Sequence, residues 1–505
     1  MNFACNIPAF SILLLMLSGV LCIILKEKAA ARFASIVIGI VLIANLYLLG
    51  CFIGGMEPFT YSMGHFGSPY GNELRAGLLE AMLAVLFSAV CLLSIMGGRS
   101  HIHHDIFAFK VNLFYISAIF LLCSMLALNY TNDLFTAYVF IEINTITACA
   151  IVMSKDDGRT LAATMSYLIM SLVGSGLFLL SVCILYGITG NLLMEPIRAV
   201  LAIMPATSQY RVAVNVALAM FAVALALKSA LWPFSFWLPE AHSNATASSS
   251  AILSGLVLKA YIITLIKIIY RVIGFETVSA SVASDLLLVF GAAAMIMGSL
   301  KAYNETNIKR MLAYSSIGQI GYIFCGIGLG TTLGMTAAVI QIGVHAVTKS
   351  MLFIASGGLM DVSGGSKNYR ALTGAGARDP FAGAAFIVGS MSMIGIPFFA
   401  GFATKYTLVM AITNTSGWQA LVAIAAVVVS TLLTAVYYFK ALTVIFRDAE
   451  MSRSGSFLKG FLARCRALGV EYKIATALLI AANIAIGLHI DGLILLIENG
   501  LAVFG

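Results

Sequence analysis

The chain has 505 residues, of which 61% are hydrophobic and only 10% are charged, and its mean hydropathy is +1.01. A soluble domain carries about 25% charged residues, so this composition excludes a water-soluble globular protein and indicates one that lies in a lipid bilayer. The net charge of +8 gives no reason to expect nucleic-acid binding, because Lys and Arg concentrate in the loops on one side of the apolar runs.

Apolar runs long enough to cross a bilayer recur along the whole chain. We count fourteen candidate transmembrane helices joined by short loops, and we expect an all-α membrane protein with a single polytopic domain, residues 1–505. No basic residue precedes the first run and several follow it, which favours a first span over a signal peptide. The predicted spans are 9–25, 34–53, 77–96, 111–128, 133–153, 162–187, 211–231, 247–270, 282–299, 308–329, 334–360, 381–410, 418–446 and 473–497. A further apolar stretch, Leu192 to Met204, is too short to span and is expected to lie at the interface.

Predicted spans seven and twelve are both interrupted near a lysine. Span seven contains "KSALWPFSFWLP" and span twelve contains "GIPFFAGFATKY". The two spans are five helices apart, so they cross the membrane in opposite directions. Interrupted spans in corresponding positions are typical of inverted repeats that hold a working site at the breaks. We therefore predict two inverted five-helix repeats, spans 4–8 and 9–13, with helices 7 and 12 broken. The predicted boundaries are 1–110 for the first three spans, 111–275 and 280–446 for the repeats, and 447–505 for a cytoplasmic loop and the last span.

Lys and Arg are distributed unevenly over the predicted loops. Most of them lie on the side reached after the first span, and the opposite side holds only Arg75, Arg198, Arg211, Lys267 and Arg271. The positive-inside rule makes the basic side cytoplasmic and places both termini outside. The histidines of "HIHHD" (residues 101–105) fall in a cytoplasmic loop, where a solvated loop is favoured over a metal site.

Nine cysteines are present, but no CxxC pair occurs and most lie in apolar runs, where a thiol acts as a small hydrophobe. This pattern disfavours zinc or iron–sulfur ligation. No GxGxxG, P-loop or haem motif occurs either. We expect no cofactor, no metal and no redox centre in this chain.

Ionisable residues inside membrane spans are costly and are usually functional. Glu142 and Lys259 lie near the middle of their spans, two others are four residues apart on one helical face, and two lie beside the breaks. These candidate site residues are Glu142, Lys228, Lys259, His345, Lys349 and Lys405.

Several of these and other charged residues also have structural explanations. Glu142 and Lys228 could form an ion pair that only stabilises the fold, and a lone His345 would most often be a packing residue. Lys440 is expected to extend its amine to the interface. Glu80 could lie at the interface or contact a neighbouring subunit.

Six segments resemble the proton-translocating antiporter-like membrane subunits. The family includes three large membrane subunits of respiratory NADH:quinone oxidoreductase, the A-type and D-type subunits of multi-subunit cation/proton antiporters, and ion-pumping subunits of membrane-bound hydrogenases. The resemblance is strongest over residues 110 to 440. The segments are "NDLFTAYVFIEINTITACAIV", "LKSALWPFSFWLPEA", "SGLVLKA", "NIKRMLAYSSIGQIGYI", "HAVTKSMLFIASG" and "GIPFFAGFATKY".

The resemblance implies a role for each candidate residue. Glu142 matches the family glutamate thought to pair with the lysine of span seven, here Lys228, and Lys259 matches the central proton-relaying lysine. His345 and Lys349 match the continuation of that relay, and Lys405 matches the exit group, which is glutamate in some members. This chain has Gln341 where some long members have a second histidine, and it lacks their long C-terminal extension. It therefore resembles a short member of the D type.

These observations predict an ion-translocating subunit of a larger complex, in the plasma membrane of a prokaryote. The resemblance implies membrane-subunit partners, with H⁺, or H⁺ together with Na⁺, as the ions moved. Because no redox centre is expected, any enzymatic activity would belong to the complex, which could be an antiporter, a hydrogenase-like or an NADH:quinone oxidoreductase-like machine. Two other classes stay open: a self-contained secondary transporter of a small solute, and a structural subunit with a vestigial channel.

Overall fold

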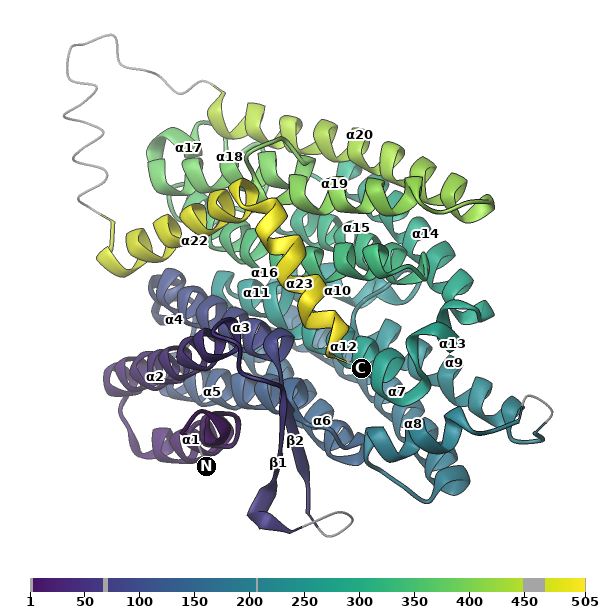
Figure 1. Ribbon diagram of the computed structural model, residues 1–505. Helices are drawn as coiled ribbons and strands as arrows, with labels where there is room; N and C mark the ends of the chain where they lie inside the picture. Colours follow the sequence, from purple (N-terminus) through teal and green to yellow (C-terminus); the bar gives the residue numbers. More distant parts are fainter. Residues whose placement is uncertain (1–2, 67–70, 206–207, 448–467, 505) are drawn as a thin grey trace, which may run out of the picture.

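The structure is a computed structural model that describes residues 3–66, 71–205, 208–447 and 468–504 (Figure 1). Within these residues it is mostly helical, and twelve helices are long and apolar enough to cross a membrane, which confirms the predicted class. The predicted count of fourteen is not confirmed. The remaining predicted spans correspond to α15 (Ile308–Gly328), which carries Ser, Gln and Tyr in its middle, and to two shorter helices on either side of a break. The twelve candidate spans are Phe3–Ile24, Glu27–Ile53, Leu78–Gly97, Ala108–Tyr130, Leu134–Met153, Gly158–Thr189, Arg211–Lys228, Ala247–Ile273, Val282–Asn304, Thr332–Asp361, Trp418–Phe446 and Val470–Leu488.

The N-terminal helices lie at the end of the molecule opposite α20 (Figure 1). Between the second and third spans the chain forms an antiparallel hairpin, which the sequence analysis did not predict, with Phe59 opposite Ala76. The hairpin extends beyond the helices in Figure 1. The elements of this part are α1 (Ile7–Leu21), α2 (Glu27–Ile53), β1 (Phe59–Ser62), β2 (Glu73–Ala76), α3 (Leu78–Gly97) and the short α4 (Arg99–Asp105).

The next group of helices contains the first predicted break. Asp133 and Asp157 precede two of these helices and accept hydrogen bonds from the backbone N–H groups of Thr136 and Arg159, as N-cap residues do. The predicted interfacial stretch forms a short helix, α8. The elements are α5 (Ala108–Tyr130), α6 (Leu134–Met153), α7 (Gly158–Thr189), α8 (Met194–Ala202), α9 (Arg211–Lys228), α10 (Trp237–Asn244), α11 (Ala247–Ile252), η5 (Leu253–Val257), α12 (Leu258–Lys267), η6 (Ile268–Ile273) and α13 (Phe275–Ser279).

The second group contains the other predicted break, and the chain ends differently from the prediction. The expected last span, 473–497, is two helices separated at His489, whose backbone torsions are not helical. Most of the expected cytoplasmic loop that begins at residue 447 lies outside the described residues. The elements are α14 (Val282–Asn304), α15, α16 (Thr332–Asp361), α17 (Ala375–Arg378), α18 (Pro380–Ile394), α19 (Ala400–Thr413), α20 (Trp418–Phe446), α22 (Val470–Leu488) and α23 (Ile490–Ala502).

Both predicted breaks are present. The first separates α9 from α10 and contains Ala230 at φ 57°, and the second separates α18 from α19 and contains Phe398 at φ 73°. Positive φ is uncommon for residues other than glycine and is found most often where the local backbone has a function. Each break leaves backbone carbonyls without helical partners inside the membrane, so polar side chains or water must satisfy them.

Two spans form the centre of the bundle. The most apolar window of the α11–α12 span, Ala247–Ile273, is 100% buried within the chain, and that of α16 is 94% buried. By comparison, only 33% of the corresponding window of α20 is buried. Side chains on α12 and α16 are therefore shielded from lipid by other helices of the same chain.

Candidate functional site

Four of the six predicted site residues have no exposed surface. Three of them lie on the two central spans and one lies at the end of α9, and each of the three lysine amines donates a hydrogen bond to a polar group. These residues are Lys228 at the end of α9, Lys259 on α12, and His345 and Lys349 on α16.

Lys228 is held by a neighbouring threonine. Its Nζ donates a hydrogen bond of 2.9 Å to Thr145 Oγ1 on α6 and lies 5.2 Å from the centre of the Tyr261 ring on α12. The Tyr261 hydroxyl in turn donates to Asn144 Oδ1 at 3.1 Å and lies 3.3 Å from Thr145 Oγ1. This small network joins the lysine at the first break to the helix that carries Lys259.

Glu142 does not form the direct ion pair that the resemblance implies. It lies on α6 one turn before Thr145 and is partly exposed, and its buried Oε1 has no hydrogen-bond partner. In the described part of the chain, no salt bridge joins Glu142 to Lys228. In this conformation Lys228 therefore belongs to the Thr145 network and Glu142 forms no hydrogen bond with it.

Lys259 lies between two π-helical turns. Its Nζ donates to the carbonyl of Ser254 in η5, which precedes α12, and η6 follows the same helix. A π-turn offsets the regular hydrogen bonds of a helix and is frequent at functional sites. Ser254 Oγ is also 2.9 Å from Ser316 Oγ on α15, so polar contacts extend from Lys259 toward the second group of helices.

His345 and Lys349 lie on the same face of α16, as their spacing predicts. Both ring nitrogens of His345 are buried without a hydrogen-bond partner. Lys349 Nζ donates to the carbonyl of Leu312 at 2.9 Å and to the hydroxyl of Tyr438 at 3.4 Å. On the other side of His345, Gln341 donates to Gln319 at 2.6 Å. The α16 face is thus polar over three turns.

Lys405 lies just after the second break. Its Nζ donates to the carbonyl of Ile394, the last residue of α18, and lies 5.6 Å from the centre of the Tyr322 ring. Unlike the four central residues, Lys405 is partly exposed. Gly395 has φ +90°, and a Cβ there would lie 2.5 Å from Lys405 Cδ, so the break gives space to this side chain.

His242 is a buried ionisable residue that the sequence analysis missed. It lies on α10, has no exposed surface, and stacks on Phe353 of α16 at 4.6 Å, and neither ring nitrogen has a hydrogen-bond partner. The sequence analysis placed it in a loop between spans seven and eight. The sequence feature that could have pointed to His242 is its position, shortly after the second of two prolines and beside a serine-rich run.

Three charged residues on the side of the membrane that has few Lys and Arg are buried, in contrast to the prediction. Glu80 forms an ion pair with Arg271, and both are at most 2% exposed. Glu80 is therefore neither interfacial nor free for a neighbouring subunit. Lys267, expected among loop residues, donates to the carbonyls of Leu128 and Asn129 at 3.0 and 2.9 Å.

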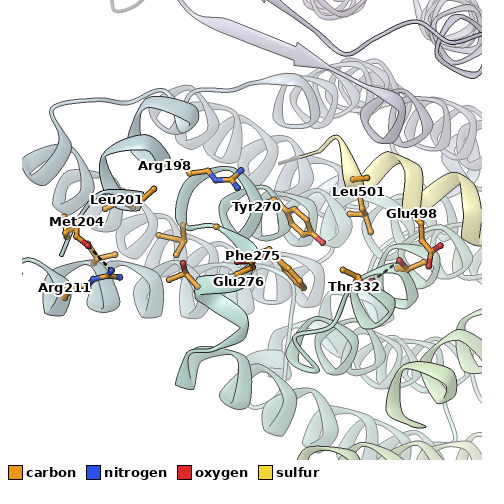
Figure 2. Close-up of a pocket in the computed structure, with 17 residues that line it drawn as sticks. Arg198, Leu201, Met204, Arg211, Tyr270, Phe275, Glu276, Thr332, Glu498 and Leu501 are labelled. Atoms are coloured by element: carbon orange, nitrogen blue, oxygen red, sulfur yellow. Dashed lines mark hydrogen bonds between the residues drawn. The ribbon is translucent and has the colours of Figure 1, made fainter. Parts of the chain in front are cut away.

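A polar cavity of about 740 Å³ lies near the same end (Figure 2). Arg198, Arg211, Glu276 and Glu498 line it, and Figure 2 shows them on separate elements around the hollow. None of the predicted site residues lines this cavity. Among the residues that the structure describes, no group of His, Cys, Asp and Glu side chains is arranged to hold a metal ion.

Broken helices and buried amines define a polytopic membrane protein with a polar interior. The chain belongs to the family described as NADH:quinone oxidoreductase/Mrp antiporter, TM, which its residues 131–434 match. The resemblance drawn from the sequence motifs is thereby confirmed.

Relatives come from two kinds of complex. The chain is 32% identical over 418 residues to the N subunit of the NADH-quinone oxidoreductase of Desulforudis audaxviator (strain MP104C), with 82% of this chain and 79% of the relative covered. It is 26% identical over 385 residues to the D subunit of the Na(+)/H(+) antiporter of Alkalihalophilus pseudofirmus, with 76% and 75% covered. The structure of the Mrp complex from Dietzia sp. DQ12-45-1b contains a chain of the same fold, with a TM-score of 0.84, 24% identity, and 100% of this chain and 97% of that chain covered.

Proposed function

We propose that this chain carries protons across the plasma membrane of a prokaryote as one subunit of a multi-subunit complex. The observation that supports this most directly is the complete burial of Lys228, Lys259, His345 and Lys349 on adjoining helices. Buried amines and imidazoles without carboxylate partners are expensive to maintain in a membrane. Their arrangement from one broken helix toward the other is explained by proton transfer and not by packing.

The proposed route starts at Lys228 and ends at Lys405. The amine of Lys228 and the Tyr261–Thr145 network connect α9 to α12, where Lys259 lies. From Lys259 the proton passes along His345 and Lys349 on α16 and then to Lys405 at the second break. Water in the polar interior would connect groups that do not touch, because the breaks leave carbonyls that water can satisfy.

Movement of Glu142 would control the first step. Burial favours the neutral form of an amine, and a nearby carboxylate favours its charged form. Two charges about 4 Å apart interact by roughly 4 kcal/mol at an effective dielectric near 20. Moving one charge against 100 mV requires about 2.3 kcal/mol. The interaction energy that changes when Glu142 approaches Lys228 and then withdraws is therefore large enough to drive the transfer.

Partner subunits would supply the driving energy and cover part of this chain. A partly exposed carboxylate within a span is costly unless another chain shields it, so we place a partner beside Glu142. The relatives named above are the N and D subunits of larger assemblies, which supports the presence of partner subunits. We further propose that residues 111–275 and 280–446 act as the two inverted repeats, and that both chain termini lie outside the cell.

The central test is Lys259→Ala in the complete complex, reconstituted in vesicles, with proton transport measured by a pH-sensitive dye. We expect transport to be abolished. The matched control is Lys440→Ala, because Lys440 is partly exposed, and its Nζ donates to the carbonyl of Tyr303 at 3.0 Å and lies 5.4 Å from the centre of the ring of that residue. Assembly of both variants is checked by the yield of intact complex. Normal transport by an assembled Lys259→Ala complex would contradict the proposed relay.

A further inference from the structure

The proposed relay leaves open how a proton reaches it from the basic side of the membrane. On that side the structure has a cavity of about 490 Å³ between α4, the end of α16 and the start of α22. It lies apart from the relay residues. Its ionisable lining residues are Arg99, His101, Asp361, Asp379, Glu471 and Tyr472.

His101 belongs to the "HIHHD" segment, which the sequence analysis placed in a solvated loop. That expectation is wrong for this residue, because the segment forms α4 and His101 is only 4% exposed. Its Nδ1 lies 3.4 Å from Asp361 Oδ1, and the side chain of Asp361 is 55% exposed. A solvated carboxylate thus contacts a buried imidazole, which is the arrangement that can pass a proton from water into the protein.

Small residues bring His101 against the central helices. A Cβ at Gly357 of α16 would lie 2.5 Å from His101 Nε2 and 2.8 Å from the Cβ of Ala247, the first residue of α11. The inner edge of the imidazole therefore meets the point where α10 ends and α11 begins. A side chain larger than glycine at position 357 would separate these groups.

A second carboxylate is fixed beside the first. Tyr472 donates a hydrogen bond of 3.0 Å to Asp379 Oδ2, and the glycine at position 358 leaves room for both groups. Arg99 and Glu471 form an ion pair at the rim of the cavity. The cavity therefore presents to the basic side one solvated carboxylate in contact with the imidazole of His101, and two carboxylates held by Tyr472 and Arg99.

The junction between α10 and α11 continues inward from His101. Lys309 donates to the carbonyl of Ala245, and Lys367 donates to that of Ser243, so lysine amines hold two of the buried carbonyls of the junction. His242 precedes Ser243 directly and has two unpartnered buried nitrogens. The junction therefore places polar groups between the cavity and His242, which stacks on Phe353 of the helix that carries His345 and Lys349, and water would have to bridge the groups that do not touch.

We propose that this cavity is the proton-loading site of the chain, in which Asp361 and His101 take a proton from water on the basic side and deliver it through the α10–α11 junction to His242. The inference rests on the proposed function, since a loading site requires a relay to load. The proton balance is simple. The imidazole accepts a proton at the nitrogen that faces Asp361 and releases one from the nitrogen that faces the junction, and reorientation restores the first state.

The charges around His101 suit a carrier that holds a proton only briefly. Burial lowers the pKa of His101, and Asp361 and Asp105 oppose that shift, while the positive charge of Lys309 adds to it. The exposed His104, on the same helix, makes the smallest contribution and also lowers this pKa. A neutral resting imidazole is able to accept a proton and to lose it again.

The test compares His101→Gln with His104→Gln in the complete complex in vesicles. The His104 side chain is 88% exposed, so its replacement is the matched control in the same segment. We expect His101→Gln to slow proton uptake at least about tenfold when the basic side is held near pH 8, where protons are scarce, and to recover near pH 6. Asp361→Asn should act in the same direction. His104→Gln should match the unmodified complex at both values.

A second measurement separates a carrier from a structural residue. In His101→Gly, added imidazole should restore uptake in proportion to its concentration, which a purely structural defect would not allow. Equal transport by His101→Gln and the unmodified complex at pH 8 would overturn the loading site. Uptake that stays slow at pH 6 and does not respond to imidazole would also overturn it. The Lys259→Ala variant tests the relay independently of the loading site. If Lys259→Ala abolishes transport but His101→Gln leaves it normal, only the loading site is rejected.

Discussion

Lys228 donates its hydrogen bond to Thr145, 2.9 Å away, and not to Glu142, which lies one turn earlier on the same helix. Thr145 also donates to the carbonyl of Ile141 at 2.9 Å, so its hydroxyl is held in place to receive the amine. The threonine thus occupies the position in which a carboxylate would stabilise the charged lysine permanently. In the proposed mechanism, this neutral partner leaves the amine able to gain or lose a proton when Glu142 moves.

This relationship predicts a specific effect of Thr145→Val. Valine has the same shape but offers no oxygen, so Lys228 loses its partner, and a hydrogen bond to a charged group contributes about 1.5–3 kcal/mol. We expect proton transport by the complex to fall by roughly tenfold or more. Thr145→Ser keeps the hydroxyl and should retain most of the transport. If valine and serine behave alike, the hydrogen bond has no part in transfer.

The second break predicts an effect of Gly395→Ala on Lys405. Alanine at φ +90° is strained by about 1–2 kcal/mol, and its Cβ would also collide with the Lys405 side chain. Gly365 is the control, because it has φ +76° but no atom within 4 Å of its Cβ position. Both variants should lose stability through backbone strain, measured by thermal unfolding in detergent, and Gly395→Ala should lose at least as much as Gly365→Ala because of the added collision. Only Gly395→Ala should lose transport, and equal transport by the two would refute a role for this contact.

The buried ion pair at the opposite end predicts a large stability difference between two glutamates. Removing Glu80 leaves Arg271 charged and buried, which costs about 3–5 kcal/mol. Glu195 pairs with Arg75 at 3.1 Å, but its side chain is 58% exposed, and such pairs contribute about 0–1 kcal/mol. Glu80→Ala should therefore lower the unfolding temperature far more than Glu195→Ala. Comparable decreases in the unfolding temperature of the two variants would show that the Glu80–Arg271 pair is hydrated.

Asp379 begins α18 as an N-cap residue. Its Oδ1 accepts hydrogen bonds from the backbone N–H groups of Phe381 and Ala382 at 3.1 and 3.0 Å. Asparagine is an equally good cap, whereas alanine at such a position costs about 1 kcal/mol. Thermal unfolding should therefore separate Asp379→Ala from Asp379→Asn, with the asparagine variant close to the unmodified chain. An asparagine variant as unstable as the alanine variant would assign the stabilisation to the charge instead of the cap.

The pH dependence of stability should report His101. Burial lowers the pKa of this imidazole below its ordinary 6.5, so the folded chain binds its proton less readily than the unfolded chain does. Above that value both states are neutral, and the contribution of His101 does not change with pH. As pH falls below it, the unfolded state takes up a proton first and stability decreases. In thermal unfolding between about pH 7.5 and 5, His101→Gln should lose stability less steeply than the unmodified chain, and an equal slope would contradict the burial argument.

Much of the fold could be predicted from residue patterns. Apolar runs, the uneven Lys and Arg, and the two Pro- and Gly-containing interruptions are local properties, and they predicted a helical membrane protein with breaks near Lys228 and Lys405. The hairpin at 59–76 and the division of the last span at His489 were missed. Neither has a strong local signal, because the hairpin is short and residues on both sides of His489 are apolar.

The ionisable residues were found because a charge inside an apolar run is visible in the sequence. Lys259 and His345 were found in this way. His242 and His101 were missed because each lies in a more polar stretch that resembles a loop. They are buried by tertiary packing, of α10 against α7 and α15 and of α4 against α3, α5 and α11, together with Phe353 and Gly357 of α16. Thr145 was missed because its hydroxyl becomes important only where α9 brings Lys228 beside it.

The sequence by itself determined that this chain lives in a bilayer, belongs among antiporter-like subunits and carries amines at membrane depth, since hydropathy and spacing act over a few turns of one helix. The tertiary structure alone decided which groups touch: Thr145 and not Glu142 at Lys228, Arg271 at Glu80, and Asp361 at His101. These contacts join helices far apart in the chain, and such contacts depend on how side chains pack between helices.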